Sequence, residues 1–171
     1  MIELLYPDEY LDSTYQISFE ELYEKGFRGI LFDIDNTLVP HGAPADERAR
    51  SLFKRLSEIG YTTCLISNNK EPRVKNFADS VGACYIYKAG KPLPKGYQDG
   101  MRKMGTKREN TLFVGDQIFT DVLGAKRAGL YTVMTKPIHP KEEIQIVLKR
   151  YLEKIVLFFY FRSKKKKRVE K

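Results

Sequence analysis

The chain has 171 residues, of which 42% are hydrophobic and 30% are charged. This length and composition predict one globular domain with a proper core, and they leave little room for a second domain. The formal net charge of +8 is concentrated at the C-terminus, because residues 162–171 contain seven basic residues and one acidic residue. Such a distribution describes a basic tail, and it argues against the basic domain face that nucleic-acid binding requires.

Cysteine and histidine usage argues against structural zinc. Cys64 and Cys84 stand singly within apolar runs, and the only histidines are His41 and His139. Unpaired cysteines are typical of a reducing compartment. The N-terminal residues lack a signal-peptide pattern, and no apolar run approaches the ~20 residues of a membrane-spanning helix. We therefore expect a cytoplasmic protein.

The first 26 residues are expected to form a leader and a short helix. Residues 1–17 contain no clear periodicity and are expected to be irregular. The sequence from Ser18 to Glu21 is a capping-box pattern that opens a helix, and Gly26 ends it. The next element is a buried strand that leads into Leu31–Thr37, whose sequence is LFDIDNT.

Strands and helices then alternate to the end of the chain. Further strands are predicted over residues 61–67, 83–87, 111–115 and 131–135. Helices are predicted over residues 49–59, 72–81, about 97–104, 120–129 and about 140–159, from apolar spacing and from glycine and proline boundaries. This order predicts an α/β fold, a doubly wound (Rossmann-like) parallel sheet of about five strands with helices on both faces. We expect a single domain over residues 1–161, followed by the basic tail.

Polar side chains follow four of the predicted strands, at the point where each strand ends. They are Asp33, Asp35 and Thr37, then Ser67 and Asn68, then Lys91, and finally Asp116 with Asp121. Because the carboxyl ends of parallel strands share one edge of a sheet, these side chains can converge. Clustered aspartates repel each other, and Mg²⁺ bound by carboxylates, waters and a substrate phosphate relieves that repulsion. The first pair of aspartates alone fits a strand followed by an Asp-Asn turn equally well, so the prediction depends on all four clusters.

The four clusters resemble the motifs of the haloacid dehalogenase (HAD) superfamily of phosphatases, in the order in which that family has them. The segment DIDNT resembles the first motif, Ser67 the second, Lys91 with Pro92 the third, and GDQIFTD the fourth. The resemblance implies that Asp33 attacks phosphorus and that Asp35 protonates the leaving alcohol and then activates water.

The same resemblance implies the remaining site residues. Mg²⁺ would be held by Asp33, by Asp116 and by the backbone carbonyl of Asp35. Ser67 would bond the phosphoryl group and Lys91 would neutralise it, with Thr37 and Asn68 also on the substrate side.

Several of these residues have simpler alternatives. Thr37 could tie down its own turn, and Ser67 could cap a helix. Lys88 competes with Lys91, which we prefer because it precedes Pro92. Asp121 could orient Lys91 or a metal-bound water, or could sit at a helix N-terminus, where a carboxylate is favoured anyway. His41 is expected at the rim of the site without an assigned role.

Spacing between the motifs limits what can cover the site. Only one helix and one strand fit between Asp33 and Ser67, and again between Ser67 and Lys91. Neither gap holds the cap domain that many relatives use, so we expect a capless, open site. Residues 3–150 resemble the YqeG branch of subfamily IIIA, which is related to mitochondrial phosphatidylglycerophosphate phosphatases.

This resemblance implies phosphatidylglycerophosphate as substrate and phosphatidylglycerol as product. A soluble sugar or nucleotide phosphate, or a phosphorylated macromolecule, remains the alternative. A rival of another class is a phosphoryl-binding protein that has the fold without the chemistry. An oligomer is compatible with the sequence.

The C-terminal segment carries a helical apolar stripe next to basic residues. The stripe comprises Ile144, Val147, Leu148, Tyr151, Leu152, Ile155, Phe158 and Phe159. Aromatic residues beside a polybasic run are typical of segments that lie on an anionic membrane surface. The alternative is a helix that packs on the core and ends in a solvated tail.

Overall fold

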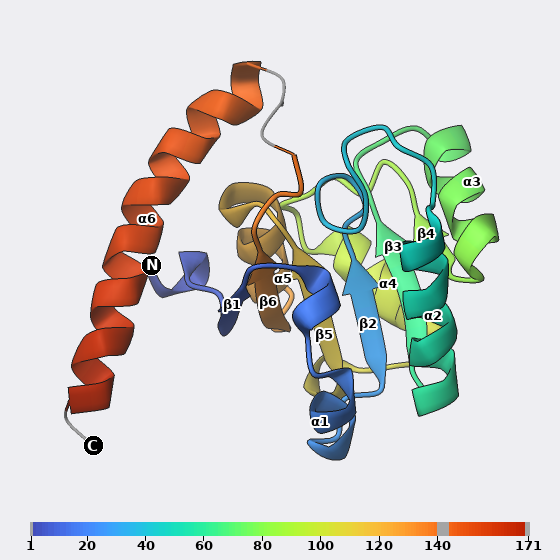
Figure 1. The fold of residues 1–171 in the computed structure, drawn as a ribbon, viewed down its shortest axis with the longest axis horizontal. Coiled ribbons are helices and arrows are strands. Elements are labelled where there is room, and N and C mark those ends of the chain that lie inside the picture. Colours follow the sequence, from blue (N-terminus) through green and yellow to red (C-terminus); the bar gives the residue numbers. More distant parts are fainter. Residues whose placement is uncertain (1, 140–143, 170–171) are drawn as a thin grey trace.

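The computed structural model describes residues 2–139 and 144–169. Within these residues, six parallel strands form one sheet in the order β1-β6-β5-β2-β3-β4 (Figure 1). The strands are β1 (Glu9–Leu11), β2 (Gly29–Phe32), β3 (Thr62–Ile66), β4 (Cys84–Ile86), β5 (Thr111–Gly115) and β6 (Tyr131–Thr135). The predicted doubly wound parallel sheet is therefore confirmed, and all five predicted strands are present.

The sixth strand corrects the prediction that residues 1–17 are irregular. Strand β1 lies at the edge of the sheet and pairs with β6, with Glu9 opposite Val133. Asp8, just before β1, stabilises this pairing, since its carboxylate accepts a hydrogen bond of 2.7 Å from the backbone N–H of Thr132. Three residues are too few to show an alternating pattern, so this strand is visible only in its pairing.

Helices cover both faces of the sheet (Figure 1). They are α1 (Phe19–Glu24), α2 (Glu47–Ile59), α3 (Glu71–Val81), α4 (Lys95–Met104), α5 (Leu123–Arg127) and α6 (Ile144–Val169), with a π-helical turn, η4, over Ile118–Val122 and 3₁₀ turns at Ile2–Leu5, Thr14–Gln16 and Arg108–Asn110. Alternate residues of β2 divide the core: Ile30 and Phe32 join the cluster under α1, α2 and α3, whereas Leu31 joins the cluster under α4 and α5.

Helix boundaries mostly follow local signals in the sequence. The Asp46 carboxylate caps α2 by accepting a 2.7 Å hydrogen bond from the N–H of Ala49, and Gly60 ends it at a φ of 111°. The predicted capping box of α1 is wrong in one respect, because the Ser18 side chain makes no capping hydrogen bond. The predicted helix over residues 120–129 is in fact the turn η4 followed by α5.

Helix α6 runs along one side of the body, beside the N-terminal segment (Figure 1). It continues to Val169, so residues 162–169 belong to the helix and do not follow it as a separate tail. Its predicted start near Pro140 lies outside the described residues. On its inner side, Tyr160 is buried and packs edge-on against Tyr6. No helix in the described part of the chain is long and apolar enough to span a membrane.

Candidate active site

The site forms at the carboxyl ends of the two central strands, β2 and β5. These strands are paired in register, and the N–H of Asp33 donates a 2.9 Å hydrogen bond to the carbonyl of Val114. This bond brings Asp33, at the end of β2, close to Asp116, which follows β5. Asp116 is fully buried and Asp33 nearly so. The predicted convergence of strand ends is therefore present in the structure.

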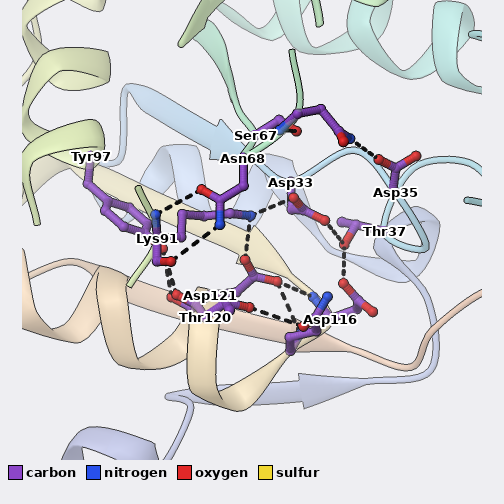
Figure 2. A network of polar contacts seen from close by, with 12 residues as sticks. Asp33, Asp35, Thr37, Ser67, Asn68, Lys91, Tyr97, Asp116, Thr120 and Asp121 are labelled. Atoms are coloured by element: carbon purple, nitrogen blue, oxygen red, sulfur yellow. Dashed lines mark hydrogen bonds and ion pairs between the residues drawn. The ribbon is translucent and has the colours of Figure 1, made fainter. Parts of the chain in front are cut away.

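Lys91 lies at the centre of the cluster. Its Nζ lies 2.6 Å from Asp33 Oδ1 and 2.6 Å from Asp121 Oδ1. Figure 2 draws both contacts as dashed lines. The competing candidate, Lys88, is exposed, so the preference for Lys91 agrees with the geometry. Asp121 also accepts hydrogen bonds of 3.1 Å from the N–H groups of Asp116 and Gln117. It therefore positions both Lys91 and the turn after β5.

Thr37 joins the two central carboxylates. Its hydroxyl lies 3.2 Å from Asp116 Oδ1 and 3.4 Å from Asp33 Oδ2. Its N–H also donates to the carbonyl of Ile34 at 3.3 Å. Thr37 therefore both fixes its own turn, as in the simpler interpretation, and contacts the site carboxylates.

Burial and mutual repulsion control the charges in this cluster. Desolvation, only partly opposed by Lys91 and reinforced by Asp121, raises the pKa of Asp33 to about 7. Desolvation and the neighbouring carboxylates also raise the pKa of Asp116 well above its ordinary value. Burial disfavours the charged form of Lys91, but Asp121 and Asp33 outweigh it and raise the lysine pKa. Lys91 is therefore firmly cationic.

The donor set fits a divalent cation. Carboxylate oxygens of Asp33, Asp116 and Asp121 all lie within 4.8 Å of one another. The three buried carboxylates outnumber the two cations that contact them, Lys91 and Arg150, and hard cations prefer such oxygen ligands. The pKa of Asp33 is raised chiefly by desolvation, and the negative charge of Asp121 and Asp35 adds to that shift.

Asp35 is close to this cluster but is bonded away from it (Figure 2). Its carboxylate accepts hydrogen bonds from Gly42 N at 2.8 Å, from Asn69 Nδ2 at 2.6 Å and from Arg73 Nη2 at 2.9 Å. Burial opposes ionisation, but the hydrogen bonds from Gly42 and Arg73, with the positive charge of Arg73, outweigh it and hold the pKa of Asp35 below its ordinary value. The two aspartates of the first motif thus have pKa values shifted in opposite directions.

Ser67 and Asn68 shape the neighbouring loops. The buried Ser67 hydroxyl accepts a 3.1 Å hydrogen bond from Asn69 N, and the N-cap of α3 is Lys70, so Ser67 does not cap that helix. The Asn68 amide bonds the backbone of Lys91, accepting from Lys91 N at 2.9 Å and donating to Lys91 O at 3.3 Å. In this way Asn68 fixes the loop that presents the lysine.

Five residues that contact this site were not singled out from the sequence. They are Asn69, Arg73, Tyr97, Arg150 and Glu153. Tyr97 Oη donates a 2.9 Å hydrogen bond to the carbonyl of Thr120, in the turn before Asp121. Arg150 of α6 pairs with the Asp116 carboxylate and donates to its carbonyl at 2.6 Å. Only Asn69 had a local signal, as part of the turn after β3.

Glu153 attaches α6 to the turn beside the site. This buried carboxylate accepts a 2.7 Å hydrogen bond from Ile118 N, at the start of η4, and a 2.9 Å bond from Arg150. Burial raises the pKa of Glu153, although Arg150 opposes this shift. The C-terminal helix is therefore joined to the site by a polar pair and is not merely packed beside it.

Comparison with known proteins agrees with this fold and site. Residues 44–129 match the haloacid dehalogenase-like hydrolase family. The chain belongs to this family, and it is a phosphatase of the phosphomonoesterase type. It is 37% identical over 152 residues to "Probable phosphatase YqeG" of Bacillus subtilis (strain 168), and the match covers 88% of each chain.

A second relative is larger than this protein. The chain is 30% identical over 165 residues to "Phosphatidylglycerophosphate phosphatase 1, chloroplastic/mitochondrial" of Arabidopsis thaliana. That match covers 81% of this chain but only 45% of the plant protein, so the chain spans less than half of the relative's length. The resemblance inferred from the four motifs is therefore confirmed at the level of the family.

Solved structures share the fold at low sequence identity. A HAD superfamily (subfamily III A) hydrolase from Legionella pneumophila has a TM-score of 0.53 and 16% identity, covering 71% of this chain and 72% of its own. The cobalt-bound deoxy-D-mannose-octulosonate 8-phosphate phosphatase from Haemophilus influenzae has a TM-score of 0.52 and 16% identity, covering 81% and 92%. In the fully described stretch between Asp33 and Lys91 only α2, β3, α3 and β4 occur, which confirms the capless core.

Proposed function

We propose that the protein is a Mg²⁺-dependent phosphatase that hydrolyses phosphatidylglycerophosphate to phosphatidylglycerol through an aspartyl-phosphate. The observation that carries the chemistry is the position of Asp33, whose carboxylate lies 2.6 Å from Lys91 and within the cluster that fits a divalent cation. When bound, Mg²⁺ would neutralise charge on the carboxylates and on the phosphoryl oxygens. Asp33, Asp116 and the backbone carbonyl of Asp35 would hold it.

The transfer takes two steps on this chain's residues. An Asp33 oxygen forms a bond to phosphorus while the bond from phosphorus to the ester oxygen breaks, and Asp35 gives a proton to that oxygen. Because the pKa of Asp35 is lowered, Asp35 must take up this proton before the first transfer, and the water of the second step restores it in each later cycle. Asp35 then takes a proton from water as the water attacks the aspartyl-phosphate, which releases inorganic phosphate and restores Asp33. Lys91, Ser67 and Thr37 hold the phosphoryl oxygens throughout.

The lipid substrate is supported by the plant relative's name and by the open, capless site. A soluble sugar or nucleotide phosphate and a phosphorylated macromolecule are the alternatives. The test is kcat/KM for the lipid in mixed micelles against a panel of soluble monoesters. A soluble monoester preferred by ~100-fold, which equals about 2.7 kcal/mol of transition-state free energy, would make the lipid assignment wrong.

The enzymatic class is tested by substitution. Asp33→Asn and Asp35→Asn should each abolish turnover with the fold retained, and EDTA should do the same to the unmodified protein. Asp79→Asn, an exposed carboxylate on α3, is the matched control. Full activity in Asp33→Asn, or activity that EDTA leaves intact, would instead favour a phosphoryl-binding protein without catalysis.

We also propose that α6 holds this cytoplasmic protein on the surface of an anionic membrane. Its outward face exposes a continuous apolar stripe of Tyr151, Leu152, Ile155, Phe158 and Phe159, each more than half exposed. Arg162 and Lys165 are exposed further along the same helix. Apolar and cationic side chains on one helix suit a bilayer interface that carries anionic head groups.

Vesicle sedimentation tests this contact. The protein should bind phosphatidylglycerol vesicles more strongly than phosphatidylcholine vesicles, and high salt should release part of it. Ile155→Glu should weaken binding, whereas Lys54→Gln on α2 should not. Binding that neither Ile155→Glu nor removal of residues 162–171 alters would refute a role for α6, and a dimer that Ile155→Glu dissociates would assign the stripe to a second copy of the chain.

A further inference from the structure

Arg73 lies beside Asp35 and has N–H donors that its contact with Asp35 does not use. It lies near the start of α3, and its Nη2 donates a 2.9 Å hydrogen bond to Asp35 Oδ1. The side chain is 23% exposed, and its buried Nε has no hydrogen-bond partner within the described residues. A guanidinium carries five N–H donors, so a single bond to Asp35 leaves most of its capacity unused.

Satisfying Asp35 does not explain this arginine. The Asp35 carboxylate already accepts hydrogen bonds from Gly42 N and from Asn69 Nδ2, one on each oxygen. Burying a long cationic side chain costs conformational entropy and solvation. A structural ion pair therefore accounts for only part of the arrangement.

The surroundings of Arg73 provide space and positive charge. A cavity of about 210 Å³ lies between α3 and the loop after β2, and its lining includes Arg73, Gly42, Pro44 and Asn76. Two exposed lysines stand on the neighbouring segments that lead into α3 and follow β4. They are Lys70, at the N-cap of α3, and Lys88, whose N–H donates to the carbonyl of Asn69. Arg73 is the charged residue of the cavity lining and favours an anion there, and an arginine fork fits phosphate oxygens better than a lysine does.

We propose that Arg73 binds a negatively charged group on the leaving alcohol. This inference rests on the proposed function, in which Asp35 protonates the leaving oxygen, so that the leaving group must pass beside Asp35 and Arg73. The chemistry recognised is a phosphate a few bonds from the scissile oxygen. It can be the phosphodiester of a lipid head group or a second phosphate on a soluble bisphosphate.

The test compares three substrates. Dihexanoyl phosphatidylglycerophosphate has an anionic lipid leaving group, glycerol 1,3-bisphosphate has an anionic soluble one, and glycerol 1-phosphate has an uncharged one. The quantity measured is the ratio of kcat/KM for each charged-leaving-group substrate to kcat/KM for glycerol 1-phosphate. Arg73→Gln should lower this ratio by about tenfold or more, as expected for loss of a charge-assisted hydrogen bond.

Two variants separate recognition from a general effect. Arg73→Lys should recover part of the ratio, because it keeps the charge without the fork. Lys75→Gln removes an exposed cation from the same helix and should leave the ratio unchanged. A fall confined to the lipid identifies the phosphodiester as the ligand, and a fall confined to the bisphosphate identifies a soluble one.

An equal loss on all three substrates would overturn the inference, because Arg73 would then act only through Asp35. A ratio unchanged in Arg73→Gln would overturn it as well. Failure of the proposed lipid substrate has a different signature. In that case the unmodified enzyme prefers glycerol 1-phosphate to the lipid, while the dependence of the ratio on Arg73 can still be measured.

Discussion

Replacing Asp33 by asparagine should make the stability of the metal-free protein less sensitive to pH. The pKa of this carboxyl is raised from 3.8 to about 7, chiefly by desolvation. A raised pKa means that the folded state holds the proton more tightly than the unfolded chain does. The free energy of unfolding therefore falls as pH rises from 3.8 to 7, and above pH 7 the full loss is present.

The size of the effect follows from the pKa values of Asp33 in the unfolded and folded chain. A tenfold difference in proton affinity between the two states corresponds to about 1.36 kcal/mol, so the loss is roughly 1.7 kcal/mol at pH 5 and roughly 4 kcal/mol at pH 8. Between these pH values the unmodified protein should lose about 2–3 kcal/mol that Asp33→Asn does not lose. Replacing Asp33 also removes its electrostatic repulsion of Asp116, which lowers the raised pKa of Asp116. This change further reduces the pH dependence of stability in Asp33→Asn.

Urea denaturation in EDTA at pH 5 and pH 8 measures this difference for both proteins. Asp79→Asn, which alters an exposed carboxylate, is the control and should follow the unmodified protein. Equal losses of stability in the unmodified protein and in Asp33→Asn would refute the reasoning, because Asp33 would then ionise normally in the fold. Adding Mg²⁺ should recover more stability at pH 8 than at pH 5, since the ion stabilises the charged form.

Two further predictions concern the packing around the site. Glu153→Leu should destabilise the protein by about 3 kcal/mol, because it leaves the buried N–H of Ile118 without its acceptor and Arg150 without this partner. Urea denaturation measures the loss of stability, and an unchanged midpoint would contradict this prediction. Gly124→Ala should lower the free energy of unfolding by about 1–3 kcal/mol, since the added Cβ would clash with the phenol group of Tyr97. A thermal melt measures this destabilisation, and adding Tyr97→Leu to the same chain should recover part of the lost stability.

The strand-end residues could be predicted because the information about them is local. A short apolar run predicts a buried strand, and a polar residue directly after it lies at the edge where parallel sheets bind ligands. Asp33 and Asp116 follow this rule, whereas Lys91 lies five residues beyond β4 and is preferred to Lys88 only because it precedes Pro92. Strand β1 could not be predicted this way. Its three residues have no usable periodicity, and its place in the sheet depends on pairing with β6, more than a hundred residues later.

The helical residues of the site were missed for a different reason. Arg73 and Arg150 each stand on an amphipathic helix, where a charged side chain normally faces water. Nothing in the local sequence distinguishes them from exposed arginines such as Arg102. Their contacts with Asp35 and Asp116 depend on where α3 and α6 lie against the sheet, which only the tertiary structure reveals.

Arg73 helps to explain how the aspartates of one small site differ in their chemistry. Arg73 helps to hold Asp35 apart from the buried cluster, with its pKa lowered, while Asp33 and Asp116 have raised pKa values beside Lys91. A carboxylate kept apart from the cation site remains available to exchange a proton with a leaving group or with water. Carboxylates left with excess negative charge favour a divalent cation. The division separates the carboxylate that would exchange protons, Asp35, from those that would hold the cation. The lowered pKa of Asp35 means that it must take up a proton before it acts as an acid, and a bound cation would favour the ionised form of Asp33 that attacks phosphorus.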